Sequence, residues 1–304
     1  MKVLAGKTGG ARRLKVRRAS QWLTVAPALI IIFAIMIYPL LYNFYISFRY
    51  VTLANLKKGG VFIGIDNYIT LLQDETFRST LLITLRYVVV TVVLQIALAF
   101  MLALATYRGR RVLRGLVTIC LLLPKMITPA ASALIWRFIL NYETGVINYF
   151  LSSLGLKKVA FLTDAGTAMA TLNVIGVWQN IGFSFLLIIA ALMGLPHEVM
   201  EASMVDGATY FKRIRYIVLP HLKNVMMVVC LFAVINAFQT FDSIYMTTNG
   251  GPAELTQVAS IYLYRKLFTS SQMGEAAAIS VILLLISLLI SFAMTLMLRR
   301  KDHE

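Results

Sequence analysis

Charged residues and cysteines are scarce in this chain of 304 residues. Charged side chains make up 14% of it, against about 25% in an average soluble domain. Apolar side chains reach 59%, against about 45–50% in soluble domains. A soluble surface of that composition would aggregate. The shortage of charge therefore excludes an ordinary soluble domain and favours a chain whose solvent is largely lipid.

Cysteine and histidine are too few and too scattered for a disulfide framework or a metal site. The two cysteines, Cys120 and Cys230, lie inside apolar runs, where we expect buried free thiols. The three histidines, His197, His221 and His303, do not form a metal motif. No nucleophile with its base, carboxylate pair or metal cluster stands out, so the sequence predicts no enzyme and no cofactor bound by this chain.

Six apolar runs reach the length of about 20 residues that a helix needs to cross a bilayer. They are roughly Trp22–Phe48, Leu81–Thr106, Gly115–Leu140, Ala168–Leu192, Asn224–Tyr245 and Gly274–Leu298. The first run is too long for a signal peptide, so we expect an uncleaved span. Open strands cannot satisfy their backbone in lipid, so the runs predict helices. The fold expected is an all-α membrane protein: a basic tail (1–21), a six-span domain (22–298) and a short tail (299–304).

Lysine and arginine gather in clusters between these runs, and mostly on one side. With six spans, that side carries 18 of the 29 basic residues and the opposite side carries 8. Because basic loops stay in the cytoplasm, both termini are expected there, with the chain crossing a bacterial inner membrane. The net charge of +16 thus follows from membrane topology and does not indicate nucleic acid binding.

The loop of about 193–223, between the fourth and fifth runs, is long and expected in the cytoplasm. Its first half, near His197–Val205, has an amphipathic helical pattern, and Gly207 interrupts it. A second helical segment is predicted near Thr209–Leu219, with Pro220 marking a boundary or kink. Such a helix–turn–helix can dock in a groove of a partner protein or rest on lipid headgroups.

The spacing within this loop resembles a known family signature. Glu201-Ala202, Gly207, nine residues, and then Ile217-x-Leu219-Pro220 is similar to the EAA motif of ABC importer permeases. Ser203 stands at the second alanine, and Asp206 precedes Gly207 as it often does in that family. The resemblance implies a type I importer fold in which this loop couples to an ATPase. The coupling residues it implies are Glu201, Ala202, Asp206, Gly207, Ile217, Leu219 and Pro220.

Other segments look like the maltose-type carbohydrate permeases. They are Phe62–Tyr68, Trp136-Arg137, Gly145–Asn148, Phe241–Tyr245 and Thr247–Pro252. The chain departs from that pattern at Lys125, where the family often has an aromatic residue after Pro124. By this resemblance Gly250, Gly251 and Pro252 are candidates for contact with a binding protein, although we slightly favour the plain interpretation of a tight external turn.

The resemblance also implies partners. The family pairs two permease subunits with two ATPase subunits and an extracytoplasmic solute-binding protein. ATP and Mg²⁺ would then be used by the partner ATPase. The expected function is import of a sugar or sugar derivative, with this chain forming half of the pathway.

Polar positions within the runs are candidates for lining that pathway, because polar groups in lipid must face a partner or a cavity. In the fifth run, several recur at helical spacing. The candidates are Asn236, Gln239, Thr240, Asp242, Ser243, Asn180 and Lys125. The alternative is that these side chains bond across helices and hold the bundle together, which we favour for the fourth run.

Three alternatives stay open at this point. One is an ABC importer of another solute, such as glycerol-3-phosphate or another polyol derivative, an amino acid, phosphate or a metal. The second is an ion-coupled secondary transporter, which would usually place acidic residues along its spans; here Asp242 is almost alone. The third is a membrane enzyme, for which no catalytic set is visible.

Overall fold

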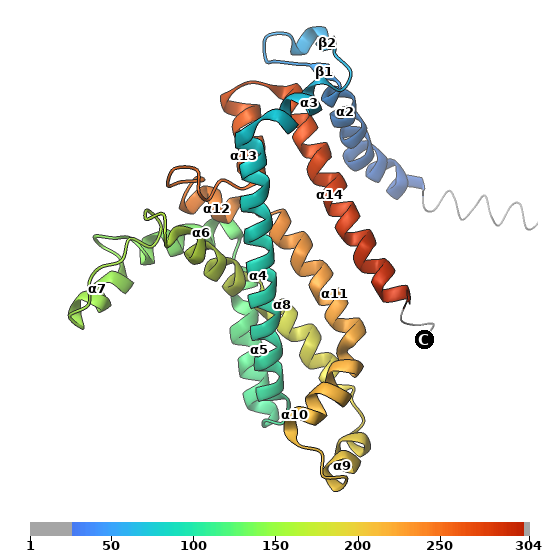
Figure 1. Ribbon diagram of the computed structural model, residues 1–304, viewed down its shortest axis with the longest axis vertical. Coiled ribbons are helices and arrows are strands. Elements are labelled where there is room, and N and C mark those ends of the chain that lie inside the picture. Colours follow the sequence, from blue (N-terminus) through green and yellow to red (C-terminus); the bar gives the residue numbers. More distant parts are fainter. Residues whose placement is uncertain (1–25, 301–304) are drawn as a thin grey trace, which may run out of the picture.

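Long apolar helices dominate the computed structural model, which describes residues 26–300 (Figure 1). In that range five helices are long and apolar enough to cross a membrane, and a bent pair supplies a sixth crossing. The predicted count of six is confirmed when the bent pair is taken as one span. The five are Ala26–Ser47, Glu75–Tyr107 (α4), Ala168–Met193 (α8), Tyr210–Phe238 and Met273–Leu296 within α14 (Met273–Arg300). The predicted tail 1–21 and residues 301–304 lie outside the described residues.

The centre of the molecule is a bundle in which α4 packs along α8, with α5 (Arg111–Met126) and α11 (Leu219–Phe238) also against α8. Small residues let these helices approach closely. Ala99 of α4 is fully buried in the same cluster as Phe185 of α8. A Cβ on Gly182 would lie 2.0 Å from the Leu121 carbonyl oxygen of α5, so only glycine fits there.

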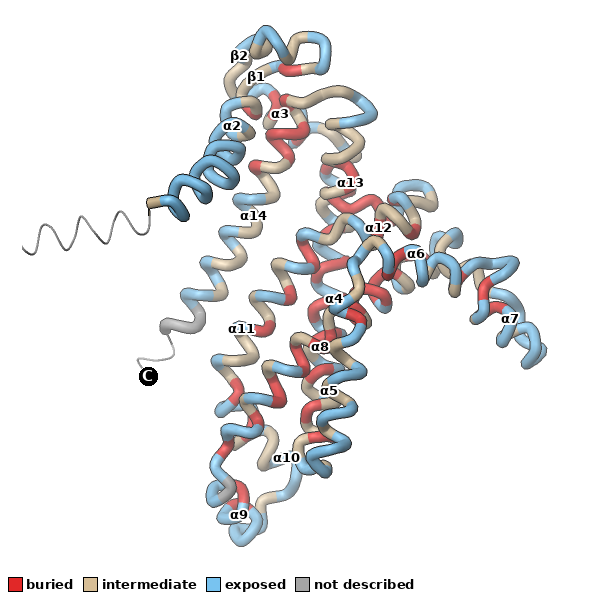
Figure 2. The backbone as a smooth tube through the Cα atoms, turned by 180° about the vertical axis from the view of Figure 1, so that it is seen from behind, coloured by how far each residue is buried: buried red, intermediate tan, exposed pale blue. Residues whose placement is uncertain are grey.

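Buried polar side chains add hydrogen bonds between α4 and α8. The Thr91 hydroxyl donates to Asn173 Oδ1 at 2.8 Å, and Gln95 Nε2 donates to Ser184 Oγ at 2.7 Å. Figure 2 shows buried residues along both helices, with others on α11, α3 (Asp66–Gln73) and α13 (Ala259–Tyr264). Asn173 and Ser184 therefore hold the bundle together, as favoured for the fourth run.

The third span is broken by 100° between α5 and α6 (Pro129–Ile139). Pro124 in the last turn of α5 lacks an N–H, and Pro129 disfavours helix at the residue before it. The run Gly115–Leu140 therefore forms two helices, with the break between Pro124 and Pro129. Cys120, expected to be buried, lies exposed on α5.

The fifth predicted span, Asn224–Tyr245, is wrong at both ends. The helix begins earlier, as α10 (Tyr210–Arg213), runs through a π-helical stretch, η3 (Ile214–Val218), into α11, and ends at Phe238. The chain then turns at Gln239 and resumes as α12 (Asp242–Thr247). The polar residues of this run therefore do not share one helix face.

Pro220 lies where the π-helix becomes α-helix, so it marks a change of helix type within a continuous span. The N–H of Leu219 bonds to the carbonyl oxygen of Ile214, five residues back. This wider turn precedes the proline and relieves the clash that its ring would make with an α-helical carbonyl. The second half of the loop is thus the first part of the fifth span and not a separate helix.

The end opposite to α9 (His197–Val205) carries a hairpin that the apolar pattern did not predict (Figure 1). Strand β1 (Arg49–Tyr50) pairs antiparallel with β2 (Val61–Phe62), with η2 (Leu56–Lys58) between them and α3 (Asp66–Gln73) after them. Buried Asn67 donates through Nδ2 to the carbonyl oxygens of Ser47 at 2.8 Å and Arg49 at 3.0 Å. It joins the end of the first span to α3.

The first span lies at the edge of the molecule. It contains η1 (Phe33–Ile37) and α2 (Tyr38–Ser47), and it packs on α14 rather than on the central bundle (Figure 1). The remaining helices are short: α7 (Val146–Ser153), α13 (Ala259–Tyr264) and the π-helical η4 (Arg265–Thr269).

Candidate functional site

The EAA loop forms the far end of the molecule, where α9 projects beyond the bundle (Figure 1). One side of α9 is buried: Met200 joins the bundle's core, and the Ser203 hydroxyl donates to the Met200 carbonyl oxygen at 2.7 Å. Glu201, Ala202 and Asp206 are exposed. The helix therefore presents the predicted coupling residues to the outside while Met200 anchors it.

Gly207 closes α9 in a left-handed conformation, with φ +73°. Its N–H bonds to the Met204 carbonyl oxygen at 3.1 Å, and the Ala208 N–H bonds to the Ser203 carbonyl oxygen at 2.9 Å. This pair of bonds is the Schellman motif, which requires glycine or asparagine at the left-handed position. A Cβ at Gly207 would meet no atom within 4 Å, so backbone conformation, and not space, explains the glycine.

The last three positions of the motif lie on the helix that follows. Ile217 is half-buried against the bundle's core, whereas Leu219 and Pro220 are exposed where the π-helix becomes α-helix. Ile217 thus positions the loop, and the other two shape its helix.

Glu201 shares a surface pocket of about 480 Å³ with two basic residues, Arg108 and Arg114, and with Met200 and Met204. Within the described residues Glu201 makes no ion pair. The basic cluster between the second and third spans therefore lies beside the EAA helix, which the sequence did not indicate.

The packing of α5 on α8 places two predicted pathway residues, Lys125 and Asn180, in contact. Lys125 is exposed at the end of α5, and its Nζ donates to Asn180 Oδ1 at 2.6 Å. Asn180 Nδ2 in turn donates to the Gly176 carbonyl oxygen of its own helix at 3.0 Å. No acidic side chain of the described residues lies within ion-pair distance of Lys125.

Two phenylalanines link this pair to a third predicted residue. Phe183, one turn along α8 from Asn180, packs edge-on against Phe232 of α11, with ring centroids 5.6 Å apart. Asn236 follows Phe232 by one turn and is exposed, with its Nδ2 donating to the Phe232 carbonyl oxygen at 2.8 Å. We call this set the polar–aromatic face: Lys125, Asn180, Phe183, Phe232 and Asn236. Sequence reasoning missed both phenylalanines, since apolar positions are unmarked among apolar neighbours.

The other predicted pathway residues lie at the break after α11. Gln239 is exposed and lines a pocket of about 440 Å³ with Phe241 and Tyr264. Thr240 Oγ1 donates to the Asn236 carbonyl oxygen at 3.2 Å, while Asp242 and Ser243 begin α12.

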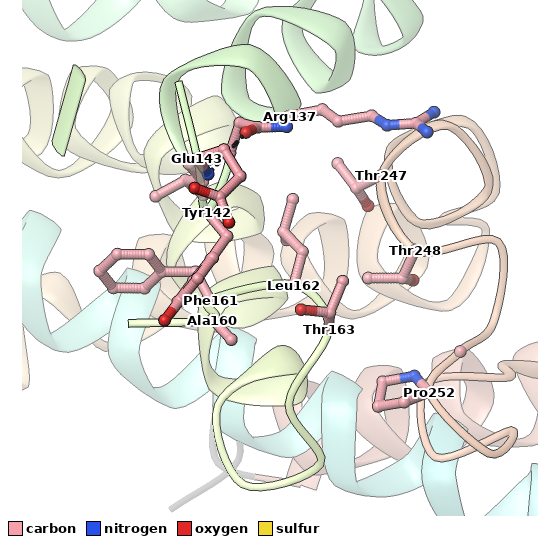
Figure 3. A pocket seen from close by; sticks show the side chains of 13 residues that line it. Arg137, Tyr142, Glu143, Ala160, Phe161, Leu162, Thr163, Thr247, Thr248 and Pro252 are labelled. Carbon is pink, nitrogen blue, oxygen red and sulfur yellow. Dashed lines mark hydrogen bonds between the residues drawn. The ribbon is translucent and has the colours of Figure 1, made fainter. Parts of the chain in front are cut away.

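The segment Gly250–Pro252 forms a turn, as its composition indicated. Gly250 has φ +85°, and the Gly251 N–H bonds to the Thr248 carbonyl oxygen at 2.9 Å. Gly251 and Pro252 line a pocket of about 470 Å³ together with Arg137, Glu143, Thr163, Thr247 and Thr248 (Figure 3). Gly250 itself is buried, so only two of the three candidates line this surface hollow.

A charged network joins the turn between α3 and α4, α13, η4 and the first turn of α14. Tyr262 donates to the Asp74 carboxylate, and Lys266 Nζ lies 2.7 Å from Glu275 Oε2. Burial raises the pKa of Asp74, but bonds from the Tyr262 hydroxyl and the Thr76 N–H, with the Lys266 charge, outweigh it and leave that pKa below its ordinary value. The network holds these segments together at this end.

The model of one protein family, the binding-protein-dependent transport system inner membrane component, matches residues 95–303. The chain belongs to this family. The permease is 33% identical to the probable ABC transporter permease protein y4oQ of Sinorhizobium fredii over 94% of this chain and 92% of that protein. It is 32% identical to the trehalose/maltose transport system permease protein MalF of Thermococcus litoralis over 89% of this chain and 90% of that protein.

Solved structures agree with this assignment. A chain of a bacterial ABC transporter involved in import of the acidic polysaccharide alginate matches the permease with a TM-score of 0.81 and 25% identity. The match covers 95% of this chain and 99% of that one. The permease thus has the type I ABC importer fold and is a multi-pass transport subunit, not an enzyme.

Proposed function

We propose that the permease forms half of the translocation pathway of an ATP-driven importer for a carbohydrate or carbohydrate derivative. Relatives named for trehalose/maltose in Thermococcus litoralis, trehalose in Mycobacterium tuberculosis and arabinooligosaccharides in Bacillus subtilis support this substrate class. The polar–aromatic face supports it as well, because amide groups and aromatic rings suit sugar hydroxyls and sugar faces.

A second candidate substrate is a polyol phosphate. The sn-glycerol-3-phosphate permease UgpA of Agrobacterium fabrum is 31% identical over 74% of this chain. Lys125 provides a positive charge for such a solute, whereas the fuller coverage of the sugar permeases favours carbohydrate.

The partners proposed are a second permease subunit, two ATPase subunits that use ATP and Mg²⁺, and an extracytoplasmic solute-binding protein. The alginate importer has also been solved in complex with a substrate-bound periplasmic protein, and it matches the permease with a TM-score of 0.80. The hollow beside Gly251 and Pro252 borders α6 and α12, which lie away from α9 in Figure 1, and we assign it to the binding-protein side.

We assign coupling between the ATPase subunits and the membrane spans to the EAA loop. Exposed Glu201 and Ala202 lie on a short helix that Met200 anchors and Gly207 ends, a shape that fits a cleft on an ATPase subunit. With this loop and both termini in the cytoplasm, movement of the ATPases on binding ATP would shift the whole span Tyr210–Phe238, because α10, η3 and α11 are continuous.

Reconstitution tests this proposal. Proteoliposomes containing the permease, its partner permease and the ATPase subunit should take up a carbohydrate only when ATP is inside and the loaded binding protein is outside. The panel should contain maltose, trehalose, arabinooligosaccharides, alginate oligosaccharides and glycerol-3-phosphate. Uptake of glycerol-3-phosphate alone would replace carbohydrate with the second candidate. Uptake without ATPase subunits, driven by an ion gradient, would contradict the proposal.

A further inference from the structure

Lys125 places a positive charge at a depth where the hydrocarbon core supplies neither water nor an opposite charge. With Arg111 at the start of α5, a rise of 1.5 Å per residue puts Lys125 about 21 Å further along the helix, inside a hydrocarbon core about 30 Å thick. A charged side chain at that depth is costly unless it faces water or an opposite charge. The function proposed above does not require a cation at this position.

The described part of the chain does not neutralise this charge. Asn180 supplies one neutral acceptor at 2.6 Å, and the acidic side chains that form ion pairs, Glu75, Glu143, Glu254, Asp74 and Glu275, pair with other cations. Lys125 has three N–H donors, so at least two remain for something outside the chain. The ammonium is exposed and held in place by Asn180, which is the arrangement of a prepared anion contact.

The neighbours of Lys125 indicate what the anion belongs to. On the polar–aromatic face, Asn180 and Asn236 carry amides, and each lies one turn along its helix from a ring of the packed pair Phe183 and Phe232. Amides bond hydroxyl groups in both directions, and aromatic rings pack against the apolar faces of sugar rings. A polyhydroxylated solute with one acidic group would satisfy the amides, the rings and the ammonium together.

We propose that the transported solute is an anionic carbohydrate, bearing a carboxylate, sulfonate or phosphate, and that Lys125 selects it by contacting that acidic group along the pathway. This inference rests on the function proposed above and specifies its substrate class. Asn180 is the positioning residue, since its Oδ1 holds the ammonium toward the face. A carboxylate of the partner permease is the competing counter-charge, and the experiment separates the two.

The test uses the complete transporter in proteoliposomes with its binding protein and matched probe pairs: trigalacturonate with galactotriose, and sulfoquinovosyl glycerol with glucosyl glycerol. The unaltered transporter should take up the acidic member of a pair and not the neutral one. Lys125→Gln should lower kcat/KM for that acidic probe about tenfold or more, since a hydrogen bond to a charged group is worth at least that factor. Lys125→Arg should retain most of it.

Lys125→His gives a readout that packing alone would not produce. Imidazole gains its charge near pH 6.5, so uptake of the acidic probe should rise as the pH falls through that value, relative to the unaltered protein at the same pH. Lys57→Gln, which removes the same charge from the distant hairpin, is the control and should leave uptake unchanged. If Lys125→Gln fails to assemble, the arginine and histidine variants carry the test.

Uptake of the neutral members without preference would overturn this inference and leave carbohydrate import standing. So would loss of ATP hydrolysis in an assembled Lys125→Gln transporter irrespective of the probe's charge, which would assign the lysine to a partner carboxylate. Unchanged kinetics for an acidic probe in Lys125→Gln would also overturn it. If no carbohydrate of either charge were carried, the proposed function itself would fail.

Discussion

At the scale of single residues, the structure separates positions that fix architecture from positions that remain open to partners. Asn67 lies in a segment that looks like the sugar permeases, yet its buried Nδ2 bonds two backbone carbonyls and joins the first span to α3. Asn148, in a second such segment, likewise bonds the backbone of Asn141 and Val159. By contrast, Glu201 and Lys125 lie exposed with donors or acceptors to spare.

Gly207 supplies a test of the coupling loop at this scale. We predict that Gly207→Val, which forces a β-branched residue into the left-handed region at a cost of at least about 1–2 kcal/mol, uncouples ATP hydrolysis from uptake. Gly207→Asp, which tolerates the conformation but adds a negative charge beside exposed Asp206 on the docking surface, should also abolish uptake while the protein still inserts. Gly207→Asn, which tolerates the conformation, should retain most of the activity. Substrate-stimulated ATP hydrolysis by the assembled complex checks this, and normal stimulation in the valine and aspartate variants would refute the role.

Asn236 and Gln239 test the pathway assignment. Because each exposes an amide, we predict that Asn236→Ala or Gln239→Ala raises the KM for uptake roughly three- to tenfold, the worth of one hydrogen bond, without changing attachment of the ATPase. Asn224→Ala, at the other end of α11 and also exposed, is the matched control. An unchanged transport profile in both variants would assign the amides to a structural role.

At the scale of elements, prolines and polar side chains decide where spans break. The break between α5 and α6 is filled by Gln179, whose Nε2 donates to the carbonyl oxygens of Pro124 at 2.6 Å and Ile127 at 2.9 Å. At the bend the Pro124 carbonyl keeps only a 3.3 Å bond from the Ile127 N–H, the Ile127 carbonyl depends on Gln179, and in lipid neither has water to bond. A side chain of the neighbouring helix α8 therefore stabilises an interruption that places Lys125 at its edge.

We predict that Gln179→Leu lowers the stability of the detergent-solubilised permease by about 1–3 kcal/mol, because the Ile127 carbonyl is left unpaired and the Pro124 carbonyl keeps only the Ile127 N–H at 3.3 Å. The midpoint of thermal unfolding measures it. Gln73→Leu, the same change at an exposed position of α3, should leave the midpoint within error. Equal midpoints for Gln179→Leu and the unaltered protein would show that the break is held by other contacts.

The sequence predicted the spans well where an element depends on apolar length alone. The fourth and sixth, α8 and α14, agree with their apolar runs to within a residue or two at every end. The sequence-based prediction of span ends failed where the chain stays apolar but the α-helix is interrupted by a turn or a π-helix. The turn after Phe238 has no proline or glycine, and the π-helix before Pro220 depends on a hydrogen bond five residues back.

The candidate sites divide in the same way. The motif formed by Glu201, Gly207 and Pro220 could be recognised in the sequence because glycine and proline have characteristic backbone preferences. The contact between Lys125 and Asn180 joins residues 55 apart, so it could not be predicted without the packing of α5 on α8. The same holds for Phe183 and Phe232, which are apolar residues among apolar neighbours.

At the scale of the whole molecule, the EAA loop and the hollow beside Pro252 lie at different ends of a bundle that links them. The span Tyr210–Phe238 begins at the loop and ends two residues before Thr240, close to the helix α12 that borders the hollow. Movement imposed at one end therefore has a continuous helix through which to reach the other. Asn236 of the polar–aromatic face lies on this helix.

The most direct test of the account is a photo-crosslinking residue placed at exposed Ala202, in membranes that contain the complete transporter. The account predicts an adduct with the ATPase subunit from position 202, and none from the matched exposed position Thr163 in the hollow of Figure 3. An ATPase adduct from position 163, or none from position 202, would contradict the claim that the EAA loop is where this permease meets its motor.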